Sequence, residues 1–244
     1  MAIFENIKPE VLFFALTGGI LPALLWLWFW LHEDRLHPEP RGMIIRTFIA
    51  GMIAVPLVLP LEQFIQKRYA LFPLFIIILW AAAEEIFKWA AAGLSALDTK
   101  EYDEPIDAVI YLLTAALWFA AMENTFFLVS LISHTNFSVS FINGNLRFIG
   151  ATLLHVLCSG TIGLFLGWSY CKGWFSRKFY AVFGIALAIL LHTVFNVYIM
   201  RVESTGTSGE LQKILMIFGV VWLAILLLIA GFEKIKKMRT CDLL

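Results

Sequence analysis

The sequence predicts an all-α fold, a polytopic transmembrane bundle of about seven helical spans. Hydrophobic residues make up 61% of the 244 residues and charged residues only 15%, whereas a soluble domain is about 45–50% apolar. The excess lies in runs long enough to cross the hydrocarbon core as a helix, which takes about 20 residues. Backbone in lipid must satisfy its hydrogen bonds within helices or closed barrels, and this favours a helical bundle. The expected spans are residues 11–31, 43–64, 71–97, 105–132, 146–170, 179–200 and 211–232.

Short polar linkers separate these runs and indicate where each span ends. The first run ends in alternating tryptophans, which are typical of an interfacial aromatic belt, before the charged linker 32–42. The second run ends near Glu62, which we interpret as an interfacial side chain without a catalytic role. The acidic segment 98–107 separates the third run from the fourth, and further polar linkers bound the remaining three runs.

The distribution of positive charge predicts the orientation of the bundle. Lysine and arginine are more frequent in the linkers on one side, which places the N-terminus outside and the C-terminus inside. Residues 233–244 then form a short basic cytoplasmic tail. We find no internal repeat, so residues 1–244 are expected to form a single transmembrane domain, with its polar motifs within residues 71–200. The expected surroundings are a lipid bilayer, and no nucleic acid is expected as a partner.

The three cysteines carry less information than the charges. Their spacing along the chain predicts neither a zinc site nor a disulfide framework. Cys158 lies within an apolar run, so we expect a buried, unreactive thiol there.

Charged and polar side chains interrupt four of the apolar runs. The third run carries the adjacent pair Glu84 and Glu85, with Lys88 one helical turn further on. Ionisable groups at bilayer depth cost at least a few kcal/mol and are therefore usually functional. The other three runs add polar side chains of the same kind, namely Glu123, Asn124, Arg147, His155, Ser159, His192 and Asn196.

Helical spacing predicts that these side chains meet. Residues four apart share a helix face, so Glu84 is expected to pair with Lys88. At 1.5 Å per residue, Glu123, His155 and His192 all lie roughly 12–14 Å below the outer surface. The glutamate pair comes out several ångströms deeper, a gap that a tilt of the third helix would reduce. We therefore expect one shared pocket in the outer half of the membrane.

Carboxylates and histidines in one pocket suit the activation of water. One glutamate can act as a general base while the histidines polarise a carbonyl group or protonate a leaving amine. Lys88 would offset one of the two adjacent negative charges. Two histidines with a carboxylate are also a common zinc set, so metal-assisted hydrolysis is an alternative. The candidate metal ligands are Glu85, Glu123, His155 and His192.

Four short segments on successive runs form a specific pattern. They are Glu-Glu-Ile-Phe-Lys at residues 84–88, Phe-Ala-Ala-Met-Glu-Asn at 119–124, the stretch 147–155, and His-Thr-Val-Phe-Asn at 192–196. Their order resembles the PrsW family of intramembrane proteases and, more distantly, the CAAX-prenyl endopeptidases and bacteriocin-processing proteins. Lys88 stands where the wider pattern has an arginine, and Glu123 where it has a histidine. Both differences favour the PrsW family over a CAAX substrate.

The resemblance implies an intramembrane endopeptidase of a bacterial plasma membrane. Its implied substrate is a single-pass membrane protein, a membrane-anchored anti-sigma factor that receives its first (site-1) cleavage and releases a stress response. The implied cofactor is zinc or none. Catalytic roles fall to the buried carboxylates, the histidines and one asparagine: Glu84 and Glu85 to activate water, His192 and Asn196 to stabilise the oxyanion, and His155 and Glu123 to assist the base or bind a metal. Supporting roles fall to Lys88, Asn124 and Arg147.

Two other functions are compatible with the same residues. Buried glutamate, histidine and lysine are equally natural in a proton- or ion-coupled membrane transporter, which is the main alternative. A transporter of this kind usually shows internal repeats and paired broken helices, and we find neither pattern in the sequence. A catalytically inactive scaffold or chaperone of the same fold is the third hypothesis.

Overall fold

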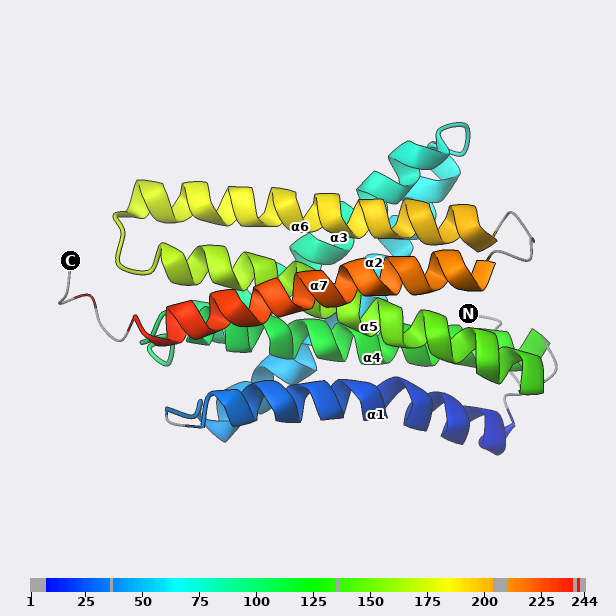
Figure 1. Cartoon of the computed structure of the whole chain (residues 1–244), viewed down its shortest axis with the longest axis horizontal. Coiled ribbons are helices and arrows are strands. Elements are labelled where there is room, and N and C mark those ends of the chain that lie inside the picture. Colours follow the sequence, from blue (N-terminus) through cyan, green and yellow to red (C-terminus); the bar gives the residue numbers. More distant parts are fainter. Residues whose placement is uncertain (1–7, 36, 135–136, 204–209, 239–240, 242–244) are drawn as a thin grey trace.

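A computed structural model describes residues 8–35, 37–134, 137–203, 210–238 and 241, and helices account for most of them. Five helices run roughly along the long axis of the molecule, while α2 and α3 cross them obliquely, so that the turn between α2 and α3 projects beyond the rest (Figure 1). The elements are α1 (Pro9–Glu33), α2 (Arg41–Arg68), α3 (Pro73–Ala92) with the short π-helix η2 (Gly93–Leu97), α4 (Asp107–His134), α5 (Phe137–Trp168), α6 (Trp174–Glu203) and α7 (Glu210–Lys236).

Proline marks where several of these helices begin. Pro9 and Pro73 lie in the first turns of α1 and α3, where the missing N–H group would have had no partner within the helix. Pro40 directly precedes α2. Pro56 and Pro60 lie inside α2 without ending it, because neighbouring helices in a membrane bundle can satisfy the carbonyl groups that a proline frees.

Among the described residues, six helices are long and apolar enough to cross a membrane, and α3 is the predicted span outside this set. It has 20 residues and carries three charged side chains, those of Glu84, Glu85 and Lys88. The fold class is confirmed as a helical membrane bundle. The helix that contains the predicted fifth span, α5, begins at Phe137, before the predicted start of that span at residue 146. Which terminus lies outside stays a prediction.

The centre of the bundle is formed by α4 and α5. In their most apolar stretches 72% and 83% of the residues are buried, against 22–33% in α1, α2, α6 and α7. Small residues allow close helix packing both within this centre and against it. A Cβ atom on Gly51 of α2 would lie 2.3 Å from the carbonyl oxygen of Ala115 in α4, and one on Gly163 of α5 would lie 2.6 Å from Cα of Val109.

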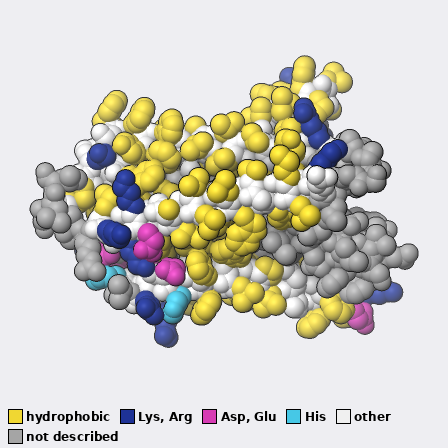
Figure 2. Space-filling view, in the orientation of Figure 1, with side chains coloured by type: hydrophobic (Ala, Val, Ile, Leu, Met, Phe, Trp, Pro, Cys, Tyr) yellow, Lys and Arg dark blue, Asp and Glu magenta, His cyan; other side chains and the backbone are white. Residues whose placement is uncertain are grey.

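The outer helices present apolar side chains to their surroundings. Figure 2 shows hydrophobic side chains covering the face of α6 and α7, with charged side chains gathered toward the ends of the molecule. Large side chains such as Phe183 on α6 and Leu227 on α7 are exposed. A soluble protein rarely exposes so much contiguous apolar surface, so this face is suited to contact with lipid.

Acidic side chains gather where the linkers after α1 and after η2 meet. Asp34 is 4% exposed, and its burial, followed by the nearby carboxylates of Asp107 and Glu104, raises its pKa to about 7. Glu39 accepts a hydrogen bond from the hydroxyl of Tyr111. Burial is also the largest cause that raises the pKa of Glu39. This cluster lies outside the membrane-spanning part of α1.

A disulfide joins Cys171, between α5 and α6, to Cys241 beyond α7. It links segments that are 70 residues apart, and the prediction of no disulfide is therefore wrong. Spacing along the chain does not reveal a pair that the packing of α5, α6 and α7 brings together. Cys158 is a free, buried cysteine, as the sequence predicted.

Candidate active site

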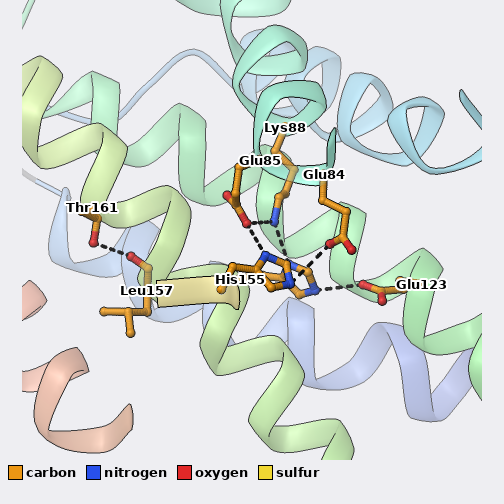
Figure 3. A network of polar contacts seen from close by, with 8 residues as sticks. Glu84, Glu85, Lys88, Glu123, His155, Leu157 and Thr161 are labelled. Atoms are coloured by element: carbon orange, nitrogen blue, oxygen red, sulfur yellow. Dashed lines mark hydrogen bonds and ion pairs between the residues drawn. The ribbon is translucent and has the colours of Figure 1, made fainter. Parts of the chain in front are cut away.

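The charged side chains of α3 lie at the centre of the bundle because α3 is lined with small residues. Ala81 and Ala92 on either side of them are fully buried, and such residues let helix backbones approach closely. Glu85 and Lys88 are fully buried, and Glu84 is 7% exposed. Figure 3 shows these three side chains pointing toward residues of α4 and α5.

A continuous polar network connects α3 to three other helices. Oε1 of Glu85 lies 2.5 Å from Nζ of Lys88 and 2.7 Å from Nδ1 of His192 on α6. Nζ of Lys88 lies 2.8 Å from Nδ1 of His155 on α5. Nε2 of His155 lies 2.9 Å from Oε2 of Glu123 on α4. The sequence expectation of a shared pocket therefore has its counterpart in these contacts (Figure 3).

The network assigns a tautomer to each histidine. An ammonium group can only donate hydrogen bonds, so Nδ1 of His155 accepts one from Lys88 and its Nε2–H donates to Glu123. Nδ1–H of His192 donates to the carboxylate of Glu85, which leaves the lone pair of Nε2 free to accept. That Nε2 atom lies 3.7 Å from Oε2 of Glu84.

A cavity of about 220 Å³ lies beside this network. Glu84 and Glu123 line the cavity, whereas Glu85 and Lys88 do not and lie behind it. Oε2 of Glu84 is buried and accepts no hydrogen bond from the described residues. The two adjacent glutamates therefore differ, because Glu84 faces the cavity and Glu85 orients Lys88 and His192. The remaining polar lining residues are Glu62, Asn124, His155, His192 and Asn196.

The same residues can hold a metal ion. One ligand atom each from Glu84, His155 and His192 lie within 4.8 Å of one another, and two histidines with a glutamate form a known zinc donor set. Metal-binding histidines usually donate their other N–H group to a carboxylate, as His192 does to Glu85. The donor set and the unpartnered oxygen of Glu84 both fit a metal. The sequence named Glu85 as a ligand in place of Glu84. Glu85 belongs to a second group of possible ligands, with Cys158 and His192, and it also accepts hydrogen bonds from Lys88 and His192.

Two sequence interpretations are corrected here. Lys88 pairs with Glu85, three residues away, and not with Glu84. Glu62, interpreted from sequence as an interfacial residue, lines the cavity with Glu84 and Glu123. The indole N–H of Trp80 donates to the backbone carbonyl of Glu62 at 3.0 Å and so holds α2 against α3. No motif marks Glu62; only the crossing of these two helices brings it to the cavity.

The supporting residues have different surroundings. The side-chain amide of Asn124 donates to Oγ1 of Thr152 at 3.1 Å and thereby joins α4 to α5 beside the cavity. Asn196 lines the cavity one helical turn after His192. Arg147 belongs to α5, but its side chain lies outside the described residues. Oγ of Ser159 is buried and has no hydrogen-bond partner among the described residues.

A polytopic helical bundle with carboxylates and histidines around a buried cavity fits a membrane-embedded enzyme of the hydrolase class. The chain belongs to the PrsW family of intramembrane metalloproteases, which it matches over residues 39–229. It is therefore an intramembrane protease, as the sequence predicted, and this assignment replaces the transporter alternative.

Three curated bacterial relatives carry the name Protease PrsW. The relative from Bacillus subtilis is 23% identical over 239 residues, 96% of this chain and 99% of its own. The relative from Halalkalibacterium halodurans is 26% identical over 194 residues, which cover 78% of this chain and 85% of the relative. The relative from Geobacillus kaustophilus is 27% identical over 200 residues, which cover 80% of this chain and 84% of the relative. No solved structure matches the chain. The predicted location, an integral membrane protein with bacterial relatives, is confirmed.

Proposed function

We propose that this protease hydrolyses a peptide bond of a single-pass membrane protein, with Glu84 as the general base. The observation that carries the proposal is that Glu84 lines the cavity, with its Oε2 3.7 Å from Nε2 of His192. Oε2 of Glu84 and Oε2 of Glu85 both have no hydrogen-bond partner among the described residues, but Glu85 does not line the cavity. A water in the cavity can give its proton to Glu84 and attack the carbonyl carbon. Glu84 then passes the proton to the leaving amide nitrogen.

The residues behind the cavity hold the reacting groups in place. Glu85 fixes His192 through Nδ1, and Glu123 fixes His155 through Nε2. Lys88 neutralises the charge of Glu85 in the dry interior, where an unpaired carboxylate would be unfavourable. Preorganised groups of this kind need no rearrangement as charge develops in the transition state.

The developing oxyanion needs a donor, and Asn196 is suited to this role. Its side-chain amide carries two N–H donors, and Asn196 lines the cavity beside His192. His192 itself was expected from sequence to share the role. Its Nδ1–H already donates to Glu85, so the remaining Nε2 acts as an acceptor and is better suited to bind a metal.

A zinc ion would be held by Glu84, Nε2 of His192 and Nε2 of His155. When bound, it would polarise the substrate carbonyl and lower the pKa of water. Binding through His155 requires the proton of its Nε2 to move to Nδ1, so His155 would give up its hydrogen bonds to both Glu123 and Lys88. With Glu84 as a ligand, the carboxylate of Glu123 would be left beside the zinc site and would take the proton of the water in place of Glu84.

The proposed substrate is a membrane-anchored anti-sigma factor, cut first at this site to release a stress response. Support comes from the motifs shared with the PrsW family at residues 84–88, 119–124 and 192–196. Because the cavity lies at the level of buried carboxylates within the bundle, the cleaved bond must lie within or next to the transmembrane segment of the substrate.

The test reconstitutes the purified protein in liposomes with a tagged single-pass anti-sigma factor from the same bacterium. We expect wild type to cut it at one position, identified by mass spectrometry, and the combined variant Glu84→Gln/His192→Ala to leave it intact. Glu101→Gln, in the exposed linker before α4, is the matched control and should cleave normally. Equal cleavage by the double variant and wild type would show that this cavity is not the proteolytic site.

A further inference from the structure

A second cavity lies on the apolar face of the bundle, outside the candidate active site. It has a volume of about 240 Å³ and is lined by α5, α6 and α7. On α6 its walls are Leu191, Val194, Phe195 and Tyr198, which follow the spacing of one helix face. The hydroxyl of Tyr198 is the single polar side-chain group among the lining residues. We call this cavity the lateral groove.

The opposite wall of the lateral groove is a second stripe, on α7. It consists of Met216, Ile217, Val220, Val221 and Ala224, again with helical spacing. Met216 is 70% exposed and Val220 is 61% exposed, so the groove opens outward between two helices. Two facing stripes with a gap between them are the surface onto which a third helix packs its ridge. Figure 2 shows this face, covered with hydrophobic side chains.

The lateral groove and the catalytic cavity share a wall. Leu154 of α5 and Phe195 of α6 line both cavities. Phe195 is 8% exposed and stands directly before Asn196 and one turn after His192 in the sequence. A segment that lies in the groove therefore needs to pass only the ring of Phe195 to reach the catalytic residues.

We propose that the lateral groove docks the transmembrane helix of the substrate, and that Phe195 is the point where the chain leaves the groove for the catalytic cavity. The occupant is an apolar helix because no charged side chain lines the groove and because both walls have helical spacing. Continuity with the catalytic cavity favours a substrate over a lipid acyl chain. This inference rests on the proteolytic function proposed above. The experiments are therefore chosen so that failure of the docking site can be distinguished from failure of the proteolytic function.

A rival entrance lies between α3 and α6. That cavity also adjoins the catalytic one, because Ile77, Trp80 and Met200 line both. Its lining includes Gln66 and Arg201, and polar groups of this kind are less suited to an apolar helix than the lateral groove.

The first measurement fills the lateral groove from its exposed positions. Met216→Trp and Val220→Trp should raise KM for the tagged single-pass anti-sigma factor and lower kcat/KM by about tenfold or more, because a docking contact acts on substrate binding. The loss should be much smaller on a short detergent-soluble peptide that spans the scissile bond, because such a peptide does not fill the groove. Val182→Trp on α6 and Leu227→Trp on α7, which are 68% and 67% exposed outside the groove, are the matched controls. Wild-type kinetics of the groove variants on the full-length substrate would overturn the docking site and leave the proposed protease function intact.

The second measurement does not depend on catalysis. Benzoylphenylalanine at position 220 or at position 227 is irradiated in liposomes that contain the same anti-sigma factor. We expect crosslinks to its transmembrane segment from position 220 and much weaker ones from position 227. Crosslinks from position 220 to phospholipid alone, or to the substrate only from a benzoylphenylalanine at position 74 in the rival entrance, would overturn the proposal. If wild type cleaves nothing yet these crosslinks form at position 220, the docking site stands and the assignment of the substrate as cleavable fails.

Discussion

Nζ of Lys88 lies 2.8 Å from Nδ1 of His155, and through this contact a single lysine connects the glutamate pair of α3 to the histidine of α5. The same ammonium group lies 2.5 Å from Glu85 and 5.1 Å from the centre of the Phe119 ring. A buried cation surrounded by a carboxylate, a ring face and a histidine lone pair stays charged and fixes the tautomer of His155. Lys88 does not line the cavity, but it orients His155, which does.

Replacement of Lys88 should destabilise the protein and impair the site together. Lys88→Met leaves the carboxylate of Glu85 buried without its cation, which costs about 3–5 kcal/mol of stability. We also expect cleavage to fall sharply, because the tautomer of His155 is no longer fixed. Thermal unfolding and the cleavage assay should both be measured. Lys88→Arg keeps the charge and should retain part of the stability and part of the activity. A Lys88→Met variant that is as stable and as active as wild type would contradict the orienting role.

Removal of metal should stop cleavage if the proposed donor set holds zinc. We expect a chelator to abolish activity and added zinc to restore it, with bound metal followed by elemental analysis. Glu85→Gln weakens the partner of a ligating histidine and should lower zinc affinity about 10–100-fold. Full activity in a protein shown by elemental analysis to contain no metal would contradict the donor set and favour a mechanism with glutamate alone.

The pKa of Asp34 predicts how stability changes with pH. Burial raises the pKa of this carboxyl group in the folded state from 3.8 to about 7, so between these values the folded state binds more protons than the unfolded state. Stability contributed by this group is complete below about pH 4 and is lost as the pH rises through 7. Asp34→Asn removes this dependence, and we expect it to raise the melting temperature at pH 8 but not at pH 4. An equal shift at both pH values would contradict the assignment.

The disulfide offers a test of orientation. With the N-terminus outside, Cys171 and Cys241 lie on the cytoplasmic side, where disulfides are kept reduced. In intact cells we therefore expect the Cys171–Cys241 disulfide to be reduced, so that both thiols react with a membrane-permeant maleimide and not with an impermeant one. Cys158, buried in α5, serves as the unreactive internal control. A pair that is oxidised in intact cells, and that the impermeant maleimide labels only after an impermeant reductant has opened the disulfide, would reverse the predicted orientation.

Much of the bundle could be predicted because hydrophobic runs and buried charge are local properties of the sequence. Counting residues along the spans placed Glu123, His155 and His192 at similar depth, and the structure joins His155 to Glu123 and both histidines to the α3 network. The choice between Glu84 and Glu85 as the partner of Lys88 could not be made in this way. Spacings of three and four residues both place side chains on one helix face, so packing against α5 and α6 decides.

Features that depend on how the helices cross could not be predicted from the sequence. Glu62 reaches the cavity because α2 crosses α3 and Trp80 holds the two together. The pair Cys171 and Cys241 meets because α5 and α7 end on the same side of the bundle. Neither arrangement leaves a periodic pattern in the chain, since each depends on helix angles that are set by packing.

The central claim is that Glu84, and not its neighbour Glu85, activates water. The most direct test compares Glu84→Gln with Glu85→Gln on the tagged single-pass substrate, with kcat and melting temperature measured for each. We predict that Glu84→Gln lowers kcat by about 10²–10⁴-fold and changes the melting temperature less than Glu85→Gln does, because Oε2 of Glu84 has no hydrogen-bond partner among the described residues. Glu85→Gln should lower the melting temperature clearly, because it leaves Lys88 buried and unpaired. A Glu84→Gln variant that cleaves at the wild-type rate would contradict the account.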